Sequence, residues 1–428
     1  MTTATSPAYE LKGKQLDAAE SIRRFLADPN ATRFLLQGGA GTGKTYTAQS
    51  LLESVKGRVL YTAPTNKAVR VLRRTLTRDD FKPECRTIYS ALGLSMKENG
   101  EVKELSAPDD PVDLSAYKLV VLDEGSMVNT QVNTFLTKAQ ETYGFKLLVM
   151  ADFCQLPPVG EPHSPLRDIS DWTVELTEPR RFENQILRQA TALRDLVLKP
   201  YARISLEDDN ADGEGVFRLG EGQFELRMRG FAADGEFSRP DAAKAIAWRN
   251  VTVDKYNAII RREIFGAEAS TLWLPGDRLT TLGPCMDLDN KKSADTDDEG
   301  IVERVEVEPH PLYEQYLTYR LTVTTDDNRL IVLRPLHQSS ALAYKRECEN
   351  LAQQAKAAPR LWGKFWELKE AFHATRHAYA TTAHRSQGST YESSFVDWRD
   401  VLINRNLIEA RRCLYVAISR AKYRVFLN

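Results

Sequence analysis

The stretch Gly38–Thr45 reads GGAGTGKT and has the residue types that bind nucleotide phosphates. Its glycines let backbone N–H groups turn toward a phosphate, and the N-terminus of a following helix adds the positive end of its dipole. The Lys44 ammonium can reach the β- and γ-phosphates, and the Thr45 hydroxyl can ligate Mg²⁺. An apolar run precedes this loop and an amphipathic stretch follows it, as a P-loop requires. We therefore predict that ATP and Mg²⁺ are bound here, through Gly38, Gly41, Thr42, Gly43, Lys44 and Thr45.

Two neighbouring carboxylates end a second apolar run. Asp123 and Glu124 follow KLVVL, the run that begins at Lys118. An acidic pair at the end of a buried strand can bind Mg²⁺ through the first residue and activate the attacking water through the second. An acidic turn that caps the next helix is the alternative. The P-loop upstream favours the catalytic interpretation, with Asp123 on the metal and Glu124 on the water.

The elements that must position these residues alternate along the first part of the chain. Short apolar runs are separated by helical patterns such as Gln15–Leu26 and Lys44–Val55. Apolar strands joined through helices predict a parallel sheet covered on both faces. The strand-like runs are Arg33–Gln37, Arg58–Ala63, Lys118–Asp123 and Lys146–Asp152.

A polar insert interrupts this alternation. Leu94–Leu105 reads LSMKENGEVKEL, and the Asn99-Gly100 pair between its two arms is typical of a tight hairpin turn. The arms carry five charged residues, so we expect the hairpin to project into solvent. The apolar residues near its turn are Met96 and Val102, and Met96 is the one we consider for contact with a ligand.

The second half of the chain first repeats the alternation and then departs from it. Ala243–Trp248 is strand-like and Thr252–Phe265 is helical, whereas Leu272–Pro335 is rich in strands and turns and predicts a small β-barrel-like insert. Two helical patterns follow. In the second, Trp362, Phe365 and Trp366 could stack on bases, but their spacing favours a helix face packed into a core.

Bulk properties are those of an ordinary globular protein. The net charge of -1 gives no global basic field, and the five cysteines have no metal-ligand spacing. We expect reduced thiols, no signal sequence, no membrane partner and a cytoplasmic protein, or one in the host cytoplasm if it is phage-encoded.

Eight motifs in a fixed order resemble those of the superfamily 1 helicases, and within them the RecD-like branch with the Dda-like helicases. The P-loop and the acidic pair are two of them, with Gln15 upstream. The others are Ala63–Ala68 (APTNKA), Thr87–Ser90 (TIYS), Asp152–Val159 (DFCQLPPV), Leu176–Arg181 (LTEPRR), Thr382–Gly388 (TAHRSQG) and Leu414–Ala421 (LYVAISRA).

The resemblance implies further residues around ATP. Gln15 resembles the glutamine that reads adenine, and Gln155 the residue that senses the γ-phosphate. Arg181 and Arg420 resemble the two arginines that close on that phosphate, and Gly388 is placed with the nucleotide. The implied catalytic set is Lys44, Glu124, Gln155, Arg181 and Arg420.

The resemblance also implies a track for a single strand of DNA. Small hydroxyl and amide groups suit phosphate contacts that position a strand without reading its sequence. Two positions depart from the family: Ala151 replaces a usual glycine, and Tyr89 replaces a usual histidine, so that Tyr89 could stack on a base. The candidates are Pro64, Thr65, Asn66, Lys67, Thr87, Tyr89, Met96, Asn257, Thr382, His384, Arg385, Ser386 and Gln387.

The expected fold is α/β, with two RecA-like P-loop domains, a β-hairpin insert in the first and an SH3-like β-barrel insert in the second. The expected bounds are 1–175 for the first domain with its hairpin at about 84–112, 176–265 and 373–428 for the second, and 266–372 for the SH3-like insert and accessory helices.

The expected function is that of a monomeric, ATP-dependent DNA helicase that moves 5′ to 3′ and unwinds duplex junctions. A single-strand-binding or replication protein is a candidate partner, in DNA replication or repair. A translocase that strips proteins from a strand, and a binding switch timed by ATP, are the alternatives.

Overall fold

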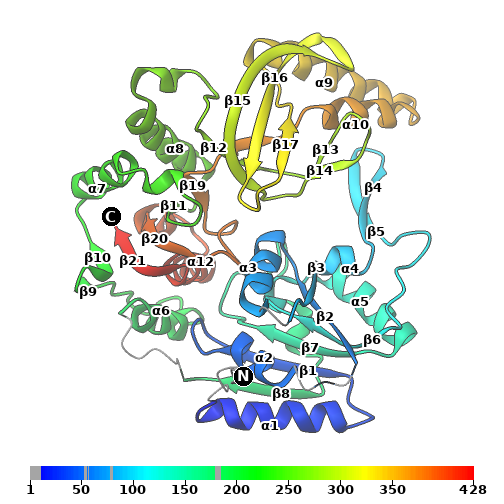
Figure 1. Cartoon of the computed structure of the whole chain (residues 1–428), viewed down its shortest axis with the longest axis vertical. Coiled ribbons are helices and arrows are strands. Elements are labelled where there is room, and N and C mark those ends of the chain that lie inside the picture. The colour runs from blue at the N-terminus through cyan, green and yellow to red at the C-terminus, as the bar shows by residue number, and fades with distance from the viewer. Residues whose placement is uncertain (1–10, 53–54, 56, 78–80, 179–184) are drawn as a thin grey trace, which may run out of the picture.

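The computed structural model describes residues 11–52, 55, 57–77, 81–178 and 185–428 (Figure 1). Its first sheet has six parallel strands in the order β3-β2-β6-β7-β1-β8. Their bounds are β1 Arg33–Gly38, β2 Arg58–Ala63, β3 Glu84–Thr87, β6 Tyr117–Leu122, β7 Lys146–Ala151 and β8 Trp172–Leu176. The surrounding helices are α1 Lys14–Ala27, α2 Lys44–Leu52, α3 Asn66–Leu76, α4 Ile88–Ala91 and α5 Thr130–Tyr143.

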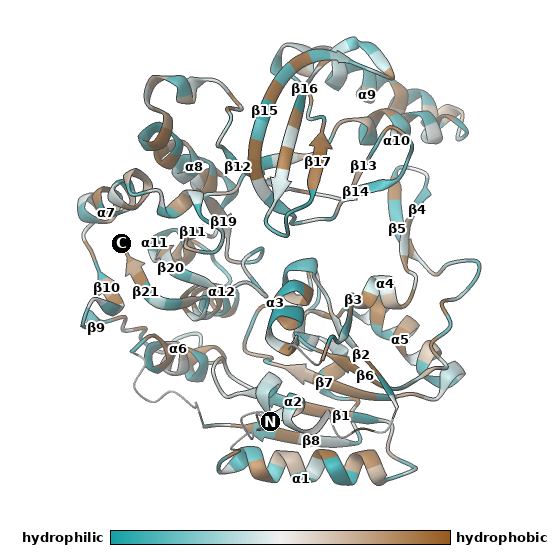
Figure 2. Ribbon diagram, viewed as in Figure 1, coloured by the Kyte–Doolittle hydropathy of each residue, from teal (hydrophilic) through white to brown (hydrophobic). Residues whose placement is uncertain are grey.

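Both faces of this sheet are covered, as the apolar runs predict. Neighbouring residues of β6 point to opposite sides: Val121 packs in one core with α1 and α3, and Val120 packs in another with α5. Both side chains are buried. Figure 2 shows the strands of this sheet largely in the brown of apolar residues. The two cores fix the carboxyl ends of the strands along one edge, where the P-loop and the acidic pair follow β1 and β6.

A second six-stranded sheet has the order β19-β11-β20-β21-β10-β9, with only β9 antiparallel to its neighbour among the described strands. Its strands are β9 Asp209–Ala211, β10 Glu214–Arg218, β11 Ala243–Ala247, β19 Ala380–Thr382, β20 Tyr391–Val396 and β21 Ala421–Leu427. Phe395 packs against α7 and α8 on one face, and Val396 packs with α6 and α12 on the other. The helices are α6 Gln185–Leu196, α7 Glu221–Ala233, α8 Asn250–Phe265, α11 Trp398–Leu402 and α12 Leu407–Ser419. Two α/β layers of this kind confirm the predicted fold class.

Between β11 and β19 the chain builds an antiparallel sheet of order β17-β16-β15-β12-β18. Its strands are β12 Arg278–Thr281, β15 Glu299–His310, β16 Tyr313–Thr325, β17 Leu330–Leu333 and β18 Thr375–His377, beside the small pair β13 Cys285–Met286 and β14 Lys292–Ala294. Helices α9 Ala341–Ala357 and α10 Leu361–Ala371 lie next to it (Figure 1). We call residues 266–372 the insert; its likeness to the SH3 type stays a prediction. Short 3₁₀ turns occur at Gly125–Met127, Pro165–Arg167, Glu236–Ser238, Gly266–Ser270 and Gln338–Ser340.

The polar segment after α4 forms two antiparallel strands, β4 Ser95–Asn99 and β5 Val102–Ser106, with Gly100 at φ 62° in the turn. Its arms are largely exposed, but its tip does not project into solvent as expected. The indole N–H of Trp366 donates to the carbonyl oxygen of Gly100 at 3.0 Å, and Lys103 pairs with Glu370. The expectation was wrong because an aromatic donor on α10 pairs the carbonyl at the turn, and sequence alone does not reveal that donor.

The aromatic stripe of α10 is a core, as its spacing predicts. Trp362, Phe365 and Trp366 are all buried and pack against Ala355 of α9. Trp366 therefore has two roles, since its ring fills this core while its N–H holds the hairpin. No helix in the described part of the chain is long and apolar enough to cross a membrane.

Candidate active site and nucleic-acid interface

The P-loop lies where β1 ends and α2 begins. Gly41 and Gly43 have φ of 73° and 82°, a left-handed backbone that favours glycine. The Lys44 ammonium donates to the carbonyl oxygen of Gly38 at 2.7 Å and of Gly39 at 3.2 Å. The Lys44 side chain is thus folded over the P-loop, whose N–H groups are expected to donate hydrogen bonds to the phosphates of ATP. Its positive charge therefore already lies at the expected phosphate site.

The acidic pair follows β6 at the same edge of the sheet. Glu124 has φ of 51°, which is strained for a residue with a side chain, and its N–H donates to Asp123 Oδ1 at 2.8 Å. Strain of this kind is held in place by its surroundings and is common at functional sites. This backbone conformation, together with the hydrogen bond to Asp123, fixes the position of the acidic pair at the end of β6.

The electrostatics of Asp123 fit a magnesium ligand. Burial, and then the neighbouring Glu124 carboxylate, raise the pKa of Asp123 to about 6, while Lys44 and a hydrogen bond from Thr45 oppose the rise. Thr45 and Asp123 thus bring together a hydroxyl and a carboxylate, the hard oxygen donors that Mg²⁺ prefers. A cation bound there would also relieve the repulsion between the two acids.

A chain of hydrogen bonds joins the P-loop to the second sheet. The N–H of Ala40 donates to the Tyr415 hydroxyl at 2.8 Å, and that hydroxyl donates to Asp152 Oδ2 at 2.5 Å. Arg194 of α6 pairs with Asp152 at 3.3 Å and lies against Gly39. Tyr415 belongs to α12, which packs on the second sheet, so the hydrogen bond connects that helix to an N–H group of the P-loop. Sequence reasoning gave no role to these three side chains, although Asp152 and Tyr415 stand inside quoted motifs.

Three side chains assigned to the nucleotide each keep a buried polar atom that pairs with nothing in the described part of the chain. They are Gln15 Oε1, Gln155 Oε1 and Arg420 Nε. The other end of Gln15 donates to the carbonyl of Thr42 at 3.0 Å, which holds its amide against the P-loop. Buried polar atoms normally have partners, so these atoms suit a polar ligand. Arg181 lies outside the described residues.

Gly388 lies apart from this group. A Cβ at Gly388 would stand 3.0 Å from the Cβ of Ala68 and 3.4 Å from the Thr65 hydroxyl, and its φ is 73°. The structure thus places it against the start of α3, beside track candidates. Its assignment to the nucleotide stays a prediction.

Most of the track candidates lie at the ends of the β-strands β2, β3 and β19 or in the segments that follow them. Pro64, Thr65, Asn66 and Lys67 follow β2 at the start of α3, and Thr382 ends β19. Thr65 and Thr87 cap helices, since their hydroxyls accept from the N–H groups of Ala68 and Ser90. These two hydroxyls stabilise the first turns of α3 and α4, next to the positions where single-stranded DNA is expected to bind.

Other candidates are anchored in the protein. Ser386 donates to the carbonyl of Ala383 at 2.8 Å, and Gln387 donates to the carbonyl of Leu156 at 3.2 Å. Asn257 is buried and accepts from the N–H of Ala380 at 2.9 Å. Asn257 thus holds strand β19, Ser386 stabilises the loop that follows it, and Gln387 fixes that loop to the first domain; their contact with DNA stays a prediction.

The two candidates on the side of α4 and the hairpin differ in exposure. Tyr89 packs beside the core under α5, where burial raises the pKa of its hydroxyl. Met96 is 54% exposed on β4. Of the two, Met96 has the surface that a base could contact.

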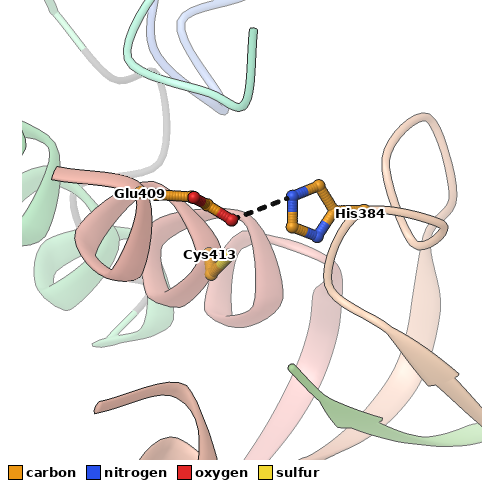
Figure 3. A group of neighbouring side chains, drawn as sticks. All are labelled: His384, Glu409 and Cys413. Atoms are coloured by element: carbon orange, nitrogen blue, oxygen red, sulfur yellow. Dashed lines mark ion pairs between the residues drawn. The ribbon is translucent and has the colours of Figure 1, made fainter. Parts of the chain in front are cut away.

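His384 contacts helix α12 (Figure 3). Its Nε2 lies 3.5 Å from Glu409 Oε1, and Cys413 stands one helical turn beyond Glu409. Burial lowers the pKa of His384, and Glu409 opposes that effect. Since α12 ends next to Arg420, this contact connects the loop after β19 with the helix that carries a nucleotide candidate.

The two cationic candidates are already paired. Lys67 Nζ lies 2.6 Å from Glu299 Oε1, and Arg385 pairs with Asp297. Both acids belong to the insert, outside the two six-stranded sheets. The two cations expected to bind DNA phosphates therefore form ion pairs with carboxylates of the protein itself.

Comparison with known proteins finds two family models that match separate parts of the chain. Residues 10–196 match the family model described as an AAA domain, and residues 377–428 match that of a UvrD-like helicase C-terminal domain. The chain is also 25% identical over 430 residues to the ATP-dependent DNA helicase dda of Enterobacteria phage T4, covering 91% of this chain and 93% of that protein. The chain belongs to the superfamily 1 helicases.

The chain is also similar to other proteins. The helicase is 24% identical over 505 residues to the uncharacterized protein R530 of Acanthamoeba polyphaga mimivirus, covering 96% of this chain and 98% of that protein. Two solved Pif1 helicase structures share its fold. One, of two coordinating Pif1 helicases at forked DNA, has a TM-score of 0.54 at 17% identity and covers 97% of this chain and 92% of its own. The other, from Bacteroides with ADP-AlF3 and single-stranded DNA, has 0.52 at 16% identity and covers 96% and 91%.

Proposed function

We propose that this ATP-driven DNA helicase moves along single-stranded DNA from 5′ to 3′ as a monomer and unwinds the duplex ahead of it. Residues 1–175 and residues 176–265 with 373–428 act as the two motor domains in this proposal, and the insert lies between the segments of the second. The observation that carries it is the chain of hydrogen bonds from Ala40 through Tyr415 to Asp152, because it ties the P-loop to the other motor domain.

ATP hydrolysis follows from the residues at the edge of the first sheet. Glu124 accepts a proton from the attacking water, whose oxygen forms a bond to the γ-phosphorus as the bond to the ADP oxygen breaks. Lys44 and Arg420 offset the charge that develops on the phosphate oxygens. Thr45 and Asp123 would hold Mg²⁺, which supplies charge neutralisation at the β- and γ-phosphates.

Movement requires that the nucleotide alters the contact between the motor domains. A bound phosphate would compete with the Tyr415 hydroxyl for the N–H of Ala40, and so change the position of α12. His384 contacts the same helix through Glu409. Closing and reopening of this cleft would alternate the grip of the two domains on a strand.

The hairpin supports unwinding over simple translocation. Its tip is held by Trp366 and Glu370 of α10, so it is fixed at both ends and can resist a duplex pushed against it. A translocase that only strips proteins is the second candidate, and a binding switch timed by ATP is the third.

The test uses duplex DNA with a single-stranded tail at either the 5′ or the 3′ end. We expect ATP-dependent unwinding with the 5′ tail and none with the 3′ tail, and no unwinding by Lys44→Ala. Unwinding from the 3′ tail alone would reverse the proposed direction. If single-stranded DNA stimulates ATP hydrolysis but no duplex is unwound, a second assay uses a labelled single strand with a protein bound tightly at one end. Displacement of that protein favours the translocase. Failure to displace it favours the binding switch.

A further inference from the structure

Helix α3 carries a row of three cations on one face. Lys67, Arg70 and Arg74 are three and four residues apart, the spacing that places side chains above one another on a helix. All three line one narrow pocket, together with Ser389 and Thr390 of the loop before β20. The row begins within the track candidates, because Lys67 follows Thr65 and Asn66.

Each cation of the row faces one acid from outside the first sheet. Arg70 lies 2.8 Å from Asp298 and Arg74 lies 3.2 Å from Asp241. Lys67 faces Glu299 in the same way. Asp241 comes from the turn before β11, and Asp298 and Glu299 come from the insert where β15 begins. From the other side, Arg385 pairs with Asp297 of the same loop.

The pairs differ in how firmly they are held. Glu299 is buried and is also bonded by Lys244 at 2.9 Å and by Arg278 at 3.3 Å, so three cations share this one carboxylate. Arg74 and Asp241 have side chains that are 61% and 48% exposed. Exposed pairs of this kind contribute little and exchange partners readily. The innermost pair is therefore an anchor, and the outer pair is exchangeable.

We infer that Arg74 and Arg385 bind phosphates of the DNA strand, and that Asp241 and Asp297 compete with those phosphates for them. A guanidinium binds carboxylate and phosphate oxygens with the same geometry, so a cation that holds an internal carboxylate is already aimed at an anion. The inference rests on the proposed function, and it adds binding residues and counter-ions to the track.

The consequence is that strand binding is an exchange of anions. Phosphates that reach Arg74 must release Asp241, and those that reach Arg385 must release Asp297. Removal of a competing carboxylate therefore strengthens strand binding, whereas loss of a structural ion pair leaves it unchanged or weaker. This gain separates competition from a purely structural role.

Two of the acids allow a conservative change. Asp241 and Asp297 have φ of 57° and 64°, a left-handed backbone that asparagine adopts as readily as aspartate. Asp241→Asn and Asp297→Asn thus remove charge with no change in size or backbone preference. Asp289→Asn, at an exposed position between β13 and β14, is the matched control.

The experiment measures the affinity of the full chain for a labelled oligo-dT strand without nucleotide, with thermal melting recorded for every variant. Asp241→Asn should bind about two- to fivefold more tightly, the range of one exposed ion pair. The double variant with Asp297→Asn should gain more, Arg74→Gln should bind more weakly, and Asp289→Asn should match the parent protein.

A double-mutant cycle then identifies the partner. If Asp241 competes for Arg74, Asp241→Asn gives no gain in an Arg74→Gln background. A gain in affinity that persists in the Arg74→Gln background overturns the inference. Unchanged or weaker binding by both aspartate variants also overturns it. In either case the proposed function stands. If the parent protein neither binds the strand nor hydrolyses ATP in response to it, the proposed function fails instead.

Discussion

Asp123 and Glu124 are adjacent in sequence, yet their geometry assigns them different work. The left-handed backbone at Glu124 differs from the conformation of its neighbour Asp123, whose carboxylate bonds with Thr45. In the proposed function Asp123 would hold the metal and Glu124 would accept the proton. Backbone strain of this kind is common at functional sites.

The first prediction concerns these residues. Glu124→Gln should lower ATP turnover by at least about 100-fold, because the amide cannot accept the proton of the attacking water. It should still bind ATP and the strand, since the shape is kept. Lys44→Ala should lose turnover and weaken ATP binding as well. Steady-state assays measure ATP turnover, and a fluorescent ATP analogue measures ATP binding. Glu141→Gln, at an exposed position, is the control. Near-normal hydrolysis by Glu124→Gln would refute the role of Glu124 as proton acceptor.

The second prediction concerns pH. The pKa of Asp123 is raised to about 6, so its carboxylate is present above that pH and is lost as the pH falls through it. Turnover should therefore decline below about pH 6, the value at which this acid takes up its proton. Mg²⁺ favours the charged form, so a higher magnesium concentration should move the midpoint to lower pH. A pH profile of hydrolysis at two magnesium concentrations checks this, and a midpoint that ignores magnesium would contradict it.

Sequence reasoning at this scale found the residues with distinctive neighbours and missed those defined by distant contacts. The P-loop and the acidic pair depend on local backbone and could be predicted. Tyr415, Arg194 and Asp152 were missed as a unit, because their connection spans up to 263 positions in sequence. Nothing in the local sequence around Arg194 indicates that it meets Gly39.

At the scale of elements, alternation of apolar runs and helices predicted the first parallel sheet, because each face of its strands is buried. The second sheet was expected chiefly from the family resemblance, since fewer of its strands stand out as apolar runs. The Asn99-Gly100 turn was likewise predictable from its local backbone preference. The sequence could not predict which part of the protein the hairpin contacts. Its contact with α10 joins residues 266 positions apart, and the donor, Trp366, belongs to a stripe whose spacing indicates only a core.

The third prediction tests the role of this contact. Trp366→Phe removes the N–H that holds Gly100 and keeps an aromatic ring in the core, so the hairpin tip should loosen. We expect slower unwinding with strand-stimulated hydrolysis unchanged, and deletion of Met96–Lys103 should abolish unwinding while hydrolysis remains. Trp273→Phe is the control, since its indole N–H is buried in the insert and bonds to no described residue. If both deletion and Trp366→Phe unwind normally, the hairpin does not separate strands.

The whole molecule is close to neutral, and its arrangement explains how a neutral protein can hold DNA. The insert lies in sequence between the loop after β2 and the loop after β19, and its acidic residues 297–299 pair with cations of α3 on one side and with Arg385 on the other. Composition could not predict this, because a net charge does not say which charges are paired. Much of the positive charge of the proposed track is balanced from within, and the exposed part of that balance is what a strand can replace.

The last prediction follows from this balance and concerns salt. Each phosphate neutralised on a single strand contributes a slope of about -0.7 in log affinity against log salt. A track of few cations should therefore give a shallow slope, roughly -2 to -4 on that scale. Carboxylates released from Arg74 and Arg385 take up salt cations in turn, which keeps the slope of the parent protein shallow. Asp241→Asn with Asp297→Asn removes that uptake, so its slope should be steeper than that of the parent. Binding titrations over a series of salt concentrations measure both slopes. A parent slope much steeper than this range would reveal a basic surface outside α3 and the loop after β19, and the exposed cations of α9 and α10 would be the first to replace.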